Sequence, residues 1–305
     1  MIYVFFLFLV ISALLIVRER RIVRQIVNLG VFSLIASACY MLLSAPDVAL
    51  AEIVVSVFST IVFIAASEKY YSSAGRFTGE RKPAPKEGII APALFIIALF
   101  ALFVLFIPGA SYNPSLKELY LKSFMDEIGG ENAVTSIYLG YRVFDTLFEA
   151  LMLLVSIVAV VHLSRYGELT VSKGKPSDIR GSVIARMTIL LISPVMILLC
   201  FYLVMNGHLT PGGGFHGGVV AASLFVCRFL IYDIYDIPID KVINIEKLLF
   251  LGIILLGALC ALSGSIAAVS ALRIPYMISM NLLIALKVCC GFLIIFYRFI
   301  AFERH

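Results

Sequence analysis

Long apolar stretches recur from one end of this 305-residue chain to the other. Hydrophobic residues make up 62% of the sequence and charged residues 14%, whereas a water-soluble domain is about a quarter charged. No water-soluble core can hide so much apolar surface, so the sequence predicts an all-α, polytopic transmembrane helical bundle. We expect nine spans, near residues 2–17, 23–44, 46–66, 89–107, 137–163, 183–205, 215–232, 247–270 and 275–302.

The basic residues lie almost entirely between these stretches. With the N-terminus outside and the C-terminus in the cytoplasm, 19 of the 24 Lys and Arg fall in cytoplasmic segments or at adjoining span ends. This distribution satisfies the positive-inside rule. It accounts for the net charge of +5 without nucleic acid, and we expect a multi-pass protein of the plasma membrane in contact with the lipid bilayer. Arg18 and further charges follow the first stretch where a signal-peptide cleavage site would need small residues, so we expect that stretch to be retained.

Two polar linkers interrupt the apolar pattern, at Ser67–Gly88 and Ser164–Gly181. Both are broken by Gly and Pro, which is typical of flexible joints. They predict a three-span block at residues 1–75, a two-span block at residues 76–170 and a four-span block at residues 171–305.

Lys287 lies about a dozen residues into the last apolar stretch, which puts its ammonium group roughly midway through the hydrocarbon. A charge at that depth costs at least a few kcal/mol, so it needs a partner, a water-filled pocket or a function. Two interpretations stay open at this point. Lys287 pairs with a carboxylate of another span or of a neighbouring chain, or its pKa is lowered by desolvation so that it exchanges protons.

Two acidic residues occur in the third span. Asp47 follows Pro46 in the predicted first helical turn, where the helix dipole favours a carboxylate, so a structural and a functional role are both open. Glu52 lies deeper, and Ser56 and Ser59 continue its face of the helix. Such a polar stripe is typical of a helix face that lines a wet pocket, which favours an ion path at Glu52.

Asp145 and Glu149 are four residues apart in the fifth span and so share one helix face. Two carboxylates that close, at low dielectric, resist joint ionisation, and one should bind a proton or attract a cation. Arg142 is placed to neutralise Asp145 as a static ion pair instead. The predicted ion-translocation residues are therefore Glu52, Asp145, Glu149, Lys287 and Asp47.

The segment from Gly207 to Gly218 contains a proline followed by three glycines, which cannot continue a helix. We expect a tight hairpin or re-entrant turn at the external mouth, with glycines that permit close packing. Its structural residues are Pro211, Gly212, Gly213, Gly214, Gly217 and Gly218. His208 and His216 are candidates for a proton relay. A metal site there is disfavoured because no carboxylate or Cys ligand is nearby in sequence, and the six cysteines form no CxxC pair.

This glycine string closely resembles the GH-x-x-PGGGFxGG signature of the B-type component of Mrp-type sodium/proton antiporters, which recurs in archaeal membrane-bound hydrogenases and sulfur-reducing complexes. The string Pro46–Glu52 resembles the PDVALTE-type motif near the C-terminus of the large antiporter component, or of the small hydrogenase component equivalent to it. The string Arg142–Glu149 is similar to the RGFDTLGE-type motif that follows there. Three such motifs in family order cover nearly the whole chain.

The chain also departs from the Mrp pattern. The three pieces are fused, and the long antiporter-like portion that precedes the first two in Mrp systems does not precede them here, which favours a respiratory complex related to complex I. Phe148 replaces a glycine in the second motif and narrows the space beside Glu149. The antiporter branch has an acidic residue near the position of Lys287, so the role of Lys287 cannot be carried over.

The resemblance implies a non-catalytic component in the membrane arm of an ion-translocating complex, which exchanges Na⁺ and H⁺. It implies partners that resemble the C-type and D-type antiporter components and a hydrogenase-like module, with ferredoxin-linked redox chemistry and Fe–S or Ni–Fe cofactors in those partners and none in this chain. Two alternatives are a structural component that only seals the complex and a component of a stand-alone Mrp antiporter. A metal-dependent intramembrane enzyme is disfavoured, because no His and carboxylate pair has ligand spacing.

Overall fold

The structure is a computed structural model that describes residues 2–72, 114–165, 169–171, 183–231, 238–262, 270–300 and 302–304. Its helices are α1 (Ile2–Arg18), α2 (Ile22–Leu42), α3 (Pro46–Ser72), α5 (Pro114–Glu127), α6 (Ala133–Ser136), the π-helix η2 (Ile137–Tyr141), α7 (Val143–Arg165), α8 (Val183–Met205), α9 (Gly214–Ile231), α10 (Ile239–Leu262) and α11 (Ser270–Ile300). Two short strands, β1 (Leu169–Val171) and β2 (Phe302–Arg304), pair in antiparallel orientation.

Seven helices in the described ranges are long and apolar enough to cross a membrane, which confirms the predicted all-α membrane fold. They are α2, α3, α7, α8, α9, α10 and α11, while α1 is apolar but shorter. Eight of the nine predicted spans therefore overlap helices, one of them, at residues 247–270, only in part. The remaining one, at residues 89–107, lies outside the described residues.

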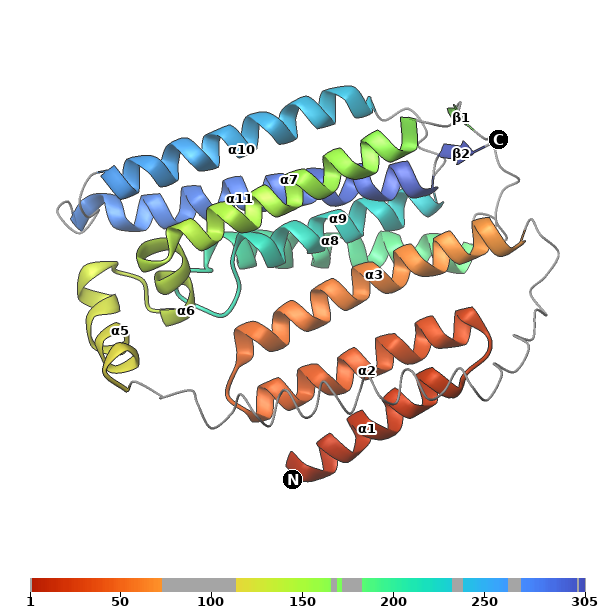
Figure 1. The fold of residues 1–305 in the computed structure, drawn as a ribbon, viewed down its shortest axis with the longest axis horizontal. Helices are drawn as coiled ribbons and strands as arrows, with labels where there is room; N and C mark the ends of the chain where they lie inside the picture. The colour runs from red at the N-terminus through yellow and green to blue at the C-terminus, as the bar shows by residue number, and fades with distance from the viewer. Residues whose placement is uncertain are drawn as a thin grey trace, which may run out of the picture.

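The long helices run roughly along one direction, with α1, α2 and α3 on one side of the bundle and α7, α10 and α11 on the other (Figure 1). The centre is made by α9, which packs against α11, α8 and α3. Within the membrane window 61% of α9 and 44% of α11 is buried, against 11–17% for the other candidate spans. The outer helices instead expose large apolar side chains, such as Leu191 of α8 at 76%, as expected for surfaces that meet lipid.

Helix α10 differs from the predicted span at residues 247–270, because it begins at Ile239. Pro238 precedes it and Asp240 lies in its first turn, both of which favour a helix start. Ile239 is buried, so the first turn is also anchored by packing. As a result Glu246, predicted to lie in a cytoplasmic connection, is inside a helix and fully buried.

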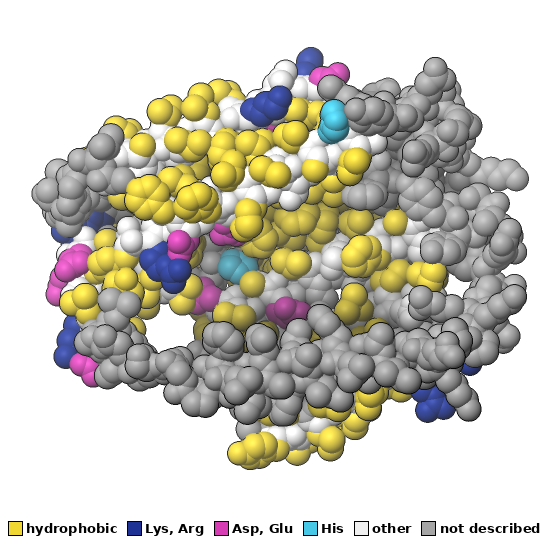
Figure 2. Space-filling view, viewed as in Figure 1, with side chains coloured by type: hydrophobic (Ala, Val, Ile, Leu, Met, Phe, Trp, Pro, Cys, Tyr) yellow, Lys and Arg dark blue, Asp and Glu magenta, His cyan; other side chains and the backbone are white. Residues whose placement is uncertain are grey.

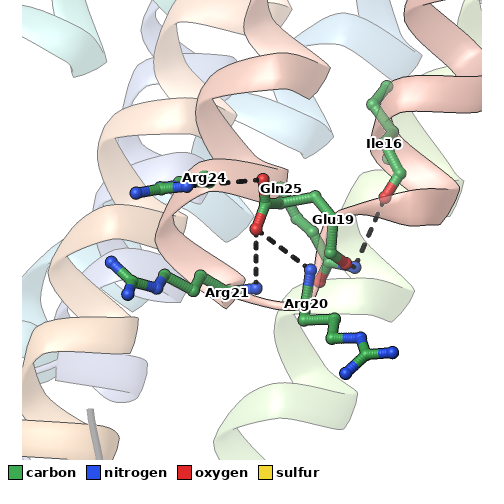
Figure 3. A network of polar contacts seen from close by, with 6 residues as sticks. All are labelled: Ile16, Glu19, Arg20, Arg21, Arg24 and Gln25. Atoms are coloured by element: carbon green, nitrogen blue, oxygen red, sulfur yellow. Dashed lines mark hydrogen bonds and ion pairs between the residues drawn. The ribbon is translucent and has the colours of Figure 1, made fainter. Parts of the chain in front are cut away.

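The turn between α1 and α2 is held by one carboxylate (Figure 3). Glu19 Oε1 accepts the backbone N–H groups of Arg20 at 3.0 Å and Arg21 at 3.2 Å, and Gln25 Nε2 donates to the Glu19 carbonyl at 2.7 Å. The hydrogen bond from the Arg21 N–H holds the pKa of Glu19 below its ordinary value of 4.5, with Arg24 as a further favourable charge. This network connects the ends of two apolar helices.

Candidate functional site

A cavity of about 50 Å³ lies among four of the membrane helices and contains two ionisable side chains, Glu149 and Lys287. Its lining consists of Thr146, Glu149, Ala150 and Leu153 from α7, Phe215 from α9, Ile253 from α10, and Ile284, Lys287 and Val288 from α11. This volume has room for at least one water molecule, since a water needs roughly 10–15 Å³. Acidic side chains and a histidine also gather in a hollow between α7 and α3 on the face seen in Figure 2.

Lys287 is 1% exposed and forms an ion pair with Glu246 of α10, which is 0% exposed. Its Nζ donates to Glu246 Oε1 and lies 5.3 Å from the centroid of the Phe250 ring, a cation–π distance. Glu246 Oε2 has no hydrogen-bond partner among the described residues. Lys287 thus has the partner that its depth demands, and it also borders a cavity.

Glu149 lines the same cavity from α7 while its side chain is exposed on the molecular surface. It therefore connects the interior next to Lys287 with the outer face of the chain. Asp145 lies one turn earlier and is also exposed. It forms an ion pair with Arg142, whose side chain is 61% exposed. The two carboxylates share a helix face, but Asp145 has a cation of its own.

Glu52 is half-buried in α3. The polar stripe predicted around it is partly used within the helix, because the Ser59 hydroxyl donates to the carbonyls of Val55 at 2.9 Å and Ser56 at 3.1 Å. Such back-bonding satisfies a hydroxyl inside an apolar helix. Glu52 does not line the cavity that contains Glu149 and Lys287.

Asp47 is buried at the N-terminal end of α3, where its carboxylate is a hydrogen-bond acceptor for two other parts of the chain. Asp47 Oδ1 accepts the backbone N–H of Gly212 and the Nδ2 group of Asn132, both at 3.2 Å. Asn132 Nδ2 also donates to the Thr210 carbonyl at 3.0 Å, while its Oδ1 caps α6 by accepting the Val134 N–H at 3.0 Å. Asp47 and Asn132 therefore hold the turn that precedes α9.

That turn connects α8 to α9 and contains the predicted glycine string. Gly213 has a φ of +125°, a conformation that L side chains rarely adopt. A Cβ on Gly214 would lie 2.3 Å from the Asn281 carbonyl oxygen, and one on Gly218 would lie 2.6 Å from the Ala285 carbonyl oxygen. The absence of side chains at these two positions, one helical turn apart, allows the α9 backbone to contact α11.

Asn281 of α11 fixes the start of α9. Its Oδ1 accepts the Gly214 N–H and the Tyr138 hydroxyl, both at 3.1 Å, and the residue is fully buried. The first N–H groups of a helix lack partners within the helix, so Asn281 satisfies one of them.

The two histidines of the turn are separated by its glycines. His208 is buried and its carbonyl accepts the Asn132 N–H at 3.0 Å, whereas its Nδ1 has no hydrogen-bond partner among the described residues. Both ring nitrogens of His216, in α9, likewise lack one, and the Asp47 carboxylate lies within electrostatic range of the ring. Neither histidine lines the cavity with Glu149. The described ranges contain no group of three His, Cys, Asp or Glu side chains that could bind a metal ion.

Three residues of this arrangement were missed by the sequence reasoning: Glu246, Asn132 and Asn281. For Glu246 a signal was present, because Ile243, Phe250 and Ile253 lie at helical spacing from it and put it on the apolar face of an earlier helix start. Asn132 and Asn281 have neutral amide side chains. The pattern of apolar residues that predicts the spans does not mark such residues as structurally important.

Comparison with known proteins gives two family matches. Residues 7–71 match MbhD, the family of the D component of MBH, and residues 184–300 match the "Domain related to MnhB subunit of Na+/H+ antiporter". The putative antiporter subunit mnhA2 of Staphylococcus aureus is 29% identical over 150 residues, which is 48% of this chain and 18% of that protein. The chain thus spans about a fifth of the length of that relative.

Two solved structures are also similar. The Mrp complex from Dietzia sp. DQ12-45-1b has a chain that matches with a TM-score of 0.78 and 18% identity, covering 98% of this chain and 34% of that one, which is a likeness of fold. The membrane-bound sulfane sulfur reductase, an archaeal respiratory membrane complex, has a chain that matches with a TM-score of 0.55 and 25% identity, covering 71% of this chain and 97% of that one. Residues 7–71 of this chain are therefore similar to MbhD, and residues 184–300 are similar to the MnhB-related domain.

Proposed function

We propose that this chain belongs to the membrane arm of an ion-translocating complex, and that it contributes a step of sodium/proton exchange at Glu149. One observation carries the proposal: Glu149 and Lys287, from two different membrane helices, line the same cavity. Ionisable groups at membrane depth are rare and usually mark ion pathways. The similar structures supply the context, since both belong to multisubunit membrane complexes.

In this proposal Glu149 binds the transported cation. Its carboxylate adjoins both the outer face and the cavity, so a proton or sodium ion taken up from a neighbouring chain binds Glu149 beside the cavity that Lys287 also lines. Glu52 provides a second acidic binding group, on α3. The ion pair of Asp145 with Arg142 sets the local charge one helical turn before Glu149. His216 is the candidate relay beside Asp47. We assign Asp47 itself to positioning, because its carboxylate already accepts two hydrogen bonds.

We further propose nine spans, with the N-terminus outside and the C-terminus in the cytoplasm. The C-terminal end of α3 and the helix α5 lie at opposite ends of the bundle (Figure 1). The positions of these two described helices support the span that the sequence predicts near residues 89–107. The basic turn between α1 and α2 lies at the same end as the C-terminal ends of α3, α7 and α11, as the positive-inside rule requires of one membrane side.

The partners and cofactors follow from the similarity alone. We propose that chains like the C-type and D-type antiporter components and a hydrogenase-like module bind this chain, and that Fe–S or Ni–Fe redox centres reside in those partners. The block boundaries at residues 75 and 170 are part of the same proposal. A purely structural role is the second candidate, and the Lys287–Glu246 and Arg142–Asp145 ion pairs favour it, because paired charges need no mobile cation.

Transport by the assembled complex in membrane vesicles separates the two candidates. Glu149→Gln keeps the size of the side chain but removes its charge, so it should abolish sodium-driven proton movement while the complex still assembles on a native gel. Glu118→Gln is the matched control, because Glu118 lies on α5, is exposed and forms an ion pair with Lys122 on the same helix. Normal exchange by an assembled Glu149→Gln complex would leave the structural role as the better one.

A further inference from the structure

The ion pair between Glu246 and Lys287 is shielded from water in this fold, since the two side chains are 0% and 1% exposed. Only one carboxylate oxygen of Glu246 has a hydrogen-bond partner among the described residues, namely Lys287 Nζ. Desolvation of two charges is repaid only when the geometry is good and the remaining lone pairs are satisfied. An ion pair with one unsatisfied oxygen is therefore costly, and stability alone is a weak reason for its presence.

The same lysine borders the cavity that Glu149 lines. A lysine ammonium is a compact charge on a flexible stem with three donors, so it can change partners by rotation of its side chain. Glu246 adjoins Lys287 on the closed side, towards α10, and Glu149 adjoins the cavity on the open side, towards α7. Lys287 is thus paired with Glu246 and shares a cavity with Glu149, and these two carboxylates have different surroundings.

The charges of these groups do not balance. With both carboxylates ionised and Lys287 protonated, the three groups carry a net charge of −1. Cys290 is a further titratable side chain beside the pair, and a thiol is neutral near pH 7. At low dielectric an uncompensated charge is strongly unfavourable, so one further monovalent cation is needed. The cavity has room for a water molecule or a small cation beside Glu149.

We infer that Glu149, Lys287 and Glu246 together form a binding site for one exchangeable monovalent cation, in which Glu246 is the resident counter-ion of Lys287. This inference rests on the proposed role of Glu149. It adds Glu246 as the residue that takes Lys287 back when a cation again occupies Glu149. When a proton or sodium ion occupies Glu149, Lys287 stays with Glu246. When that cation leaves, the bare Glu149 carboxylate attracts the ammonium group across the cavity, and the arrival of the next cation returns it to Glu246.

A pair that only stabilises the fold and a pair that takes part in exchange respond differently to joint removal. Glu246→Leu or Lys287→Met alone leaves a buried charge without its partner, which is strongly destabilising, whereas the double variant removes both charges and is often tolerated. We expect the double variant to assemble and to lose sodium–proton exchange to the level of empty vesicles. Exchange at the wild-type rate by the assembled double variant would overturn the inference.

A second variant covers the case in which the double variant does not assemble. Glu246→Asp keeps the charge but withdraws the carboxylate by one methylene from Lys287, so the assembled complex should exchange more slowly; an unchanged rate would overturn the inference. Uptake of radioactive sodium at constant pH and proton release in sodium-free buffer distinguish the two cations. If Glu149→Gln abolishes exchange while the double variant keeps it, the site inference fails and the function proposed for Glu149 stands. Normal exchange by Glu149→Gln would refute both.

Discussion

The carboxylate of Asp47 accepts the backbone N–H of Gly212, 165 positions away in the chain, at 3.2 Å. The same oxygen accepts the side-chain amide of Asn132, 85 positions away. One acidic side chain therefore joins the segment that matches MbhD, the segment before α7 and the segment that matches the MnhB-related domain. The fused chain has a polar connection between its parts at the end of the bundle where the glycine turn lies.

Loss of this carboxylate should destabilise the protein. Asp47→Ala leaves the buried Gly212 N–H without its acceptor, while Asn132 Nδ2 keeps the Gly207 and Thr210 carbonyls, so the free energy of unfolding should fall by about 1–3 kcal/mol. Thermal unfolding of the detergent-solubilised protein, followed by circular dichroism, measures it. Asp47→Asn is the matched control, because it keeps one acceptor oxygen and should cost less. Equal stability of the Ala variant and the wild type would show that the Asp47 carboxylate does not stabilise the turn before α9.

The contact between α9 and α11 makes a prediction about glycine. In Gly214→Ala the new methyl group would lie 2.3 Å from the Asn281 carbonyl oxygen, so the helices must separate, at a cost of about 1–3 kcal/mol. In Gly252→Ala the nearest atom is in the Leu283 side chain at 3.7 Å, an ordinary contact, and that variant should be as stable as the wild type. The same unfolding assay compares the two variants. Equal losses of stability would show that the close approach of α9 to α11 is not the reason for a glycine at position 214.

Asn281 and Tyr138 share one hydrogen bond but are not equivalent. Asn281→Ala leaves both the Gly214 N–H and the Tyr138 hydroxyl without an acceptor, whereas Tyr138→Phe removes only one donor. We expect a loss of about 1–3 kcal/mol for Asn281→Ala and about 1 kcal/mol for Tyr138→Phe. A double-mutant cycle measures their coupling, and strictly additive losses would show that the hydrogen bond between them contributes nothing.

The turn between α1 and α2 should weaken in acid. The pKa of Glu19 is lower in the folded protein than its ordinary value of 4.5, so its contribution to stability is present above pH 4.5 and is lost as the pH falls through the lowered pKa. Amide hydrogen exchange of Arg20 and Arg21 should therefore show less protection in acid. Glu19→Gln has no charge to titrate and should remove this pH dependence of amide protection. If the variant still loses protection in acid, another titrating group is responsible.

The positions of the helices followed from the sequence because apolar length is a strong signal in a membrane. Lys287 was expected to need a partner, a water-filled pocket or a function for a related physical reason, the cost of an unpaired charge in hydrocarbon. Its partner Glu246 was not found, since an acidic residue next to Lys247 resembles a polar connection until Pro238 and the buried Ile239 fix an earlier helix start.

The polar clamp around the glycine turn is a different case. Asn132 and Asn281 are separated from Gly212 and Gly214 by large stretches of chain, and only the fold brings them together. The glycines predicted a tight turn and close packing, because those properties are local to the string. Which partners the turn would contact depends on the order of α3, α9 and α11 in the bundle, and no pattern in one sequence contains that order.

Water in the cavity between Glu149 and Lys287 is the most direct test of the exchange step. An electron cryomicroscopy map of the assembled complex, at a resolution that shows ordered water, should contain water or cation density in this cavity, continuous with the exposed side of Glu149. A cavity closed by apolar side chains, with Lys287 bound only to Glu246 and no density beside it, would contradict cation exchange through this chain.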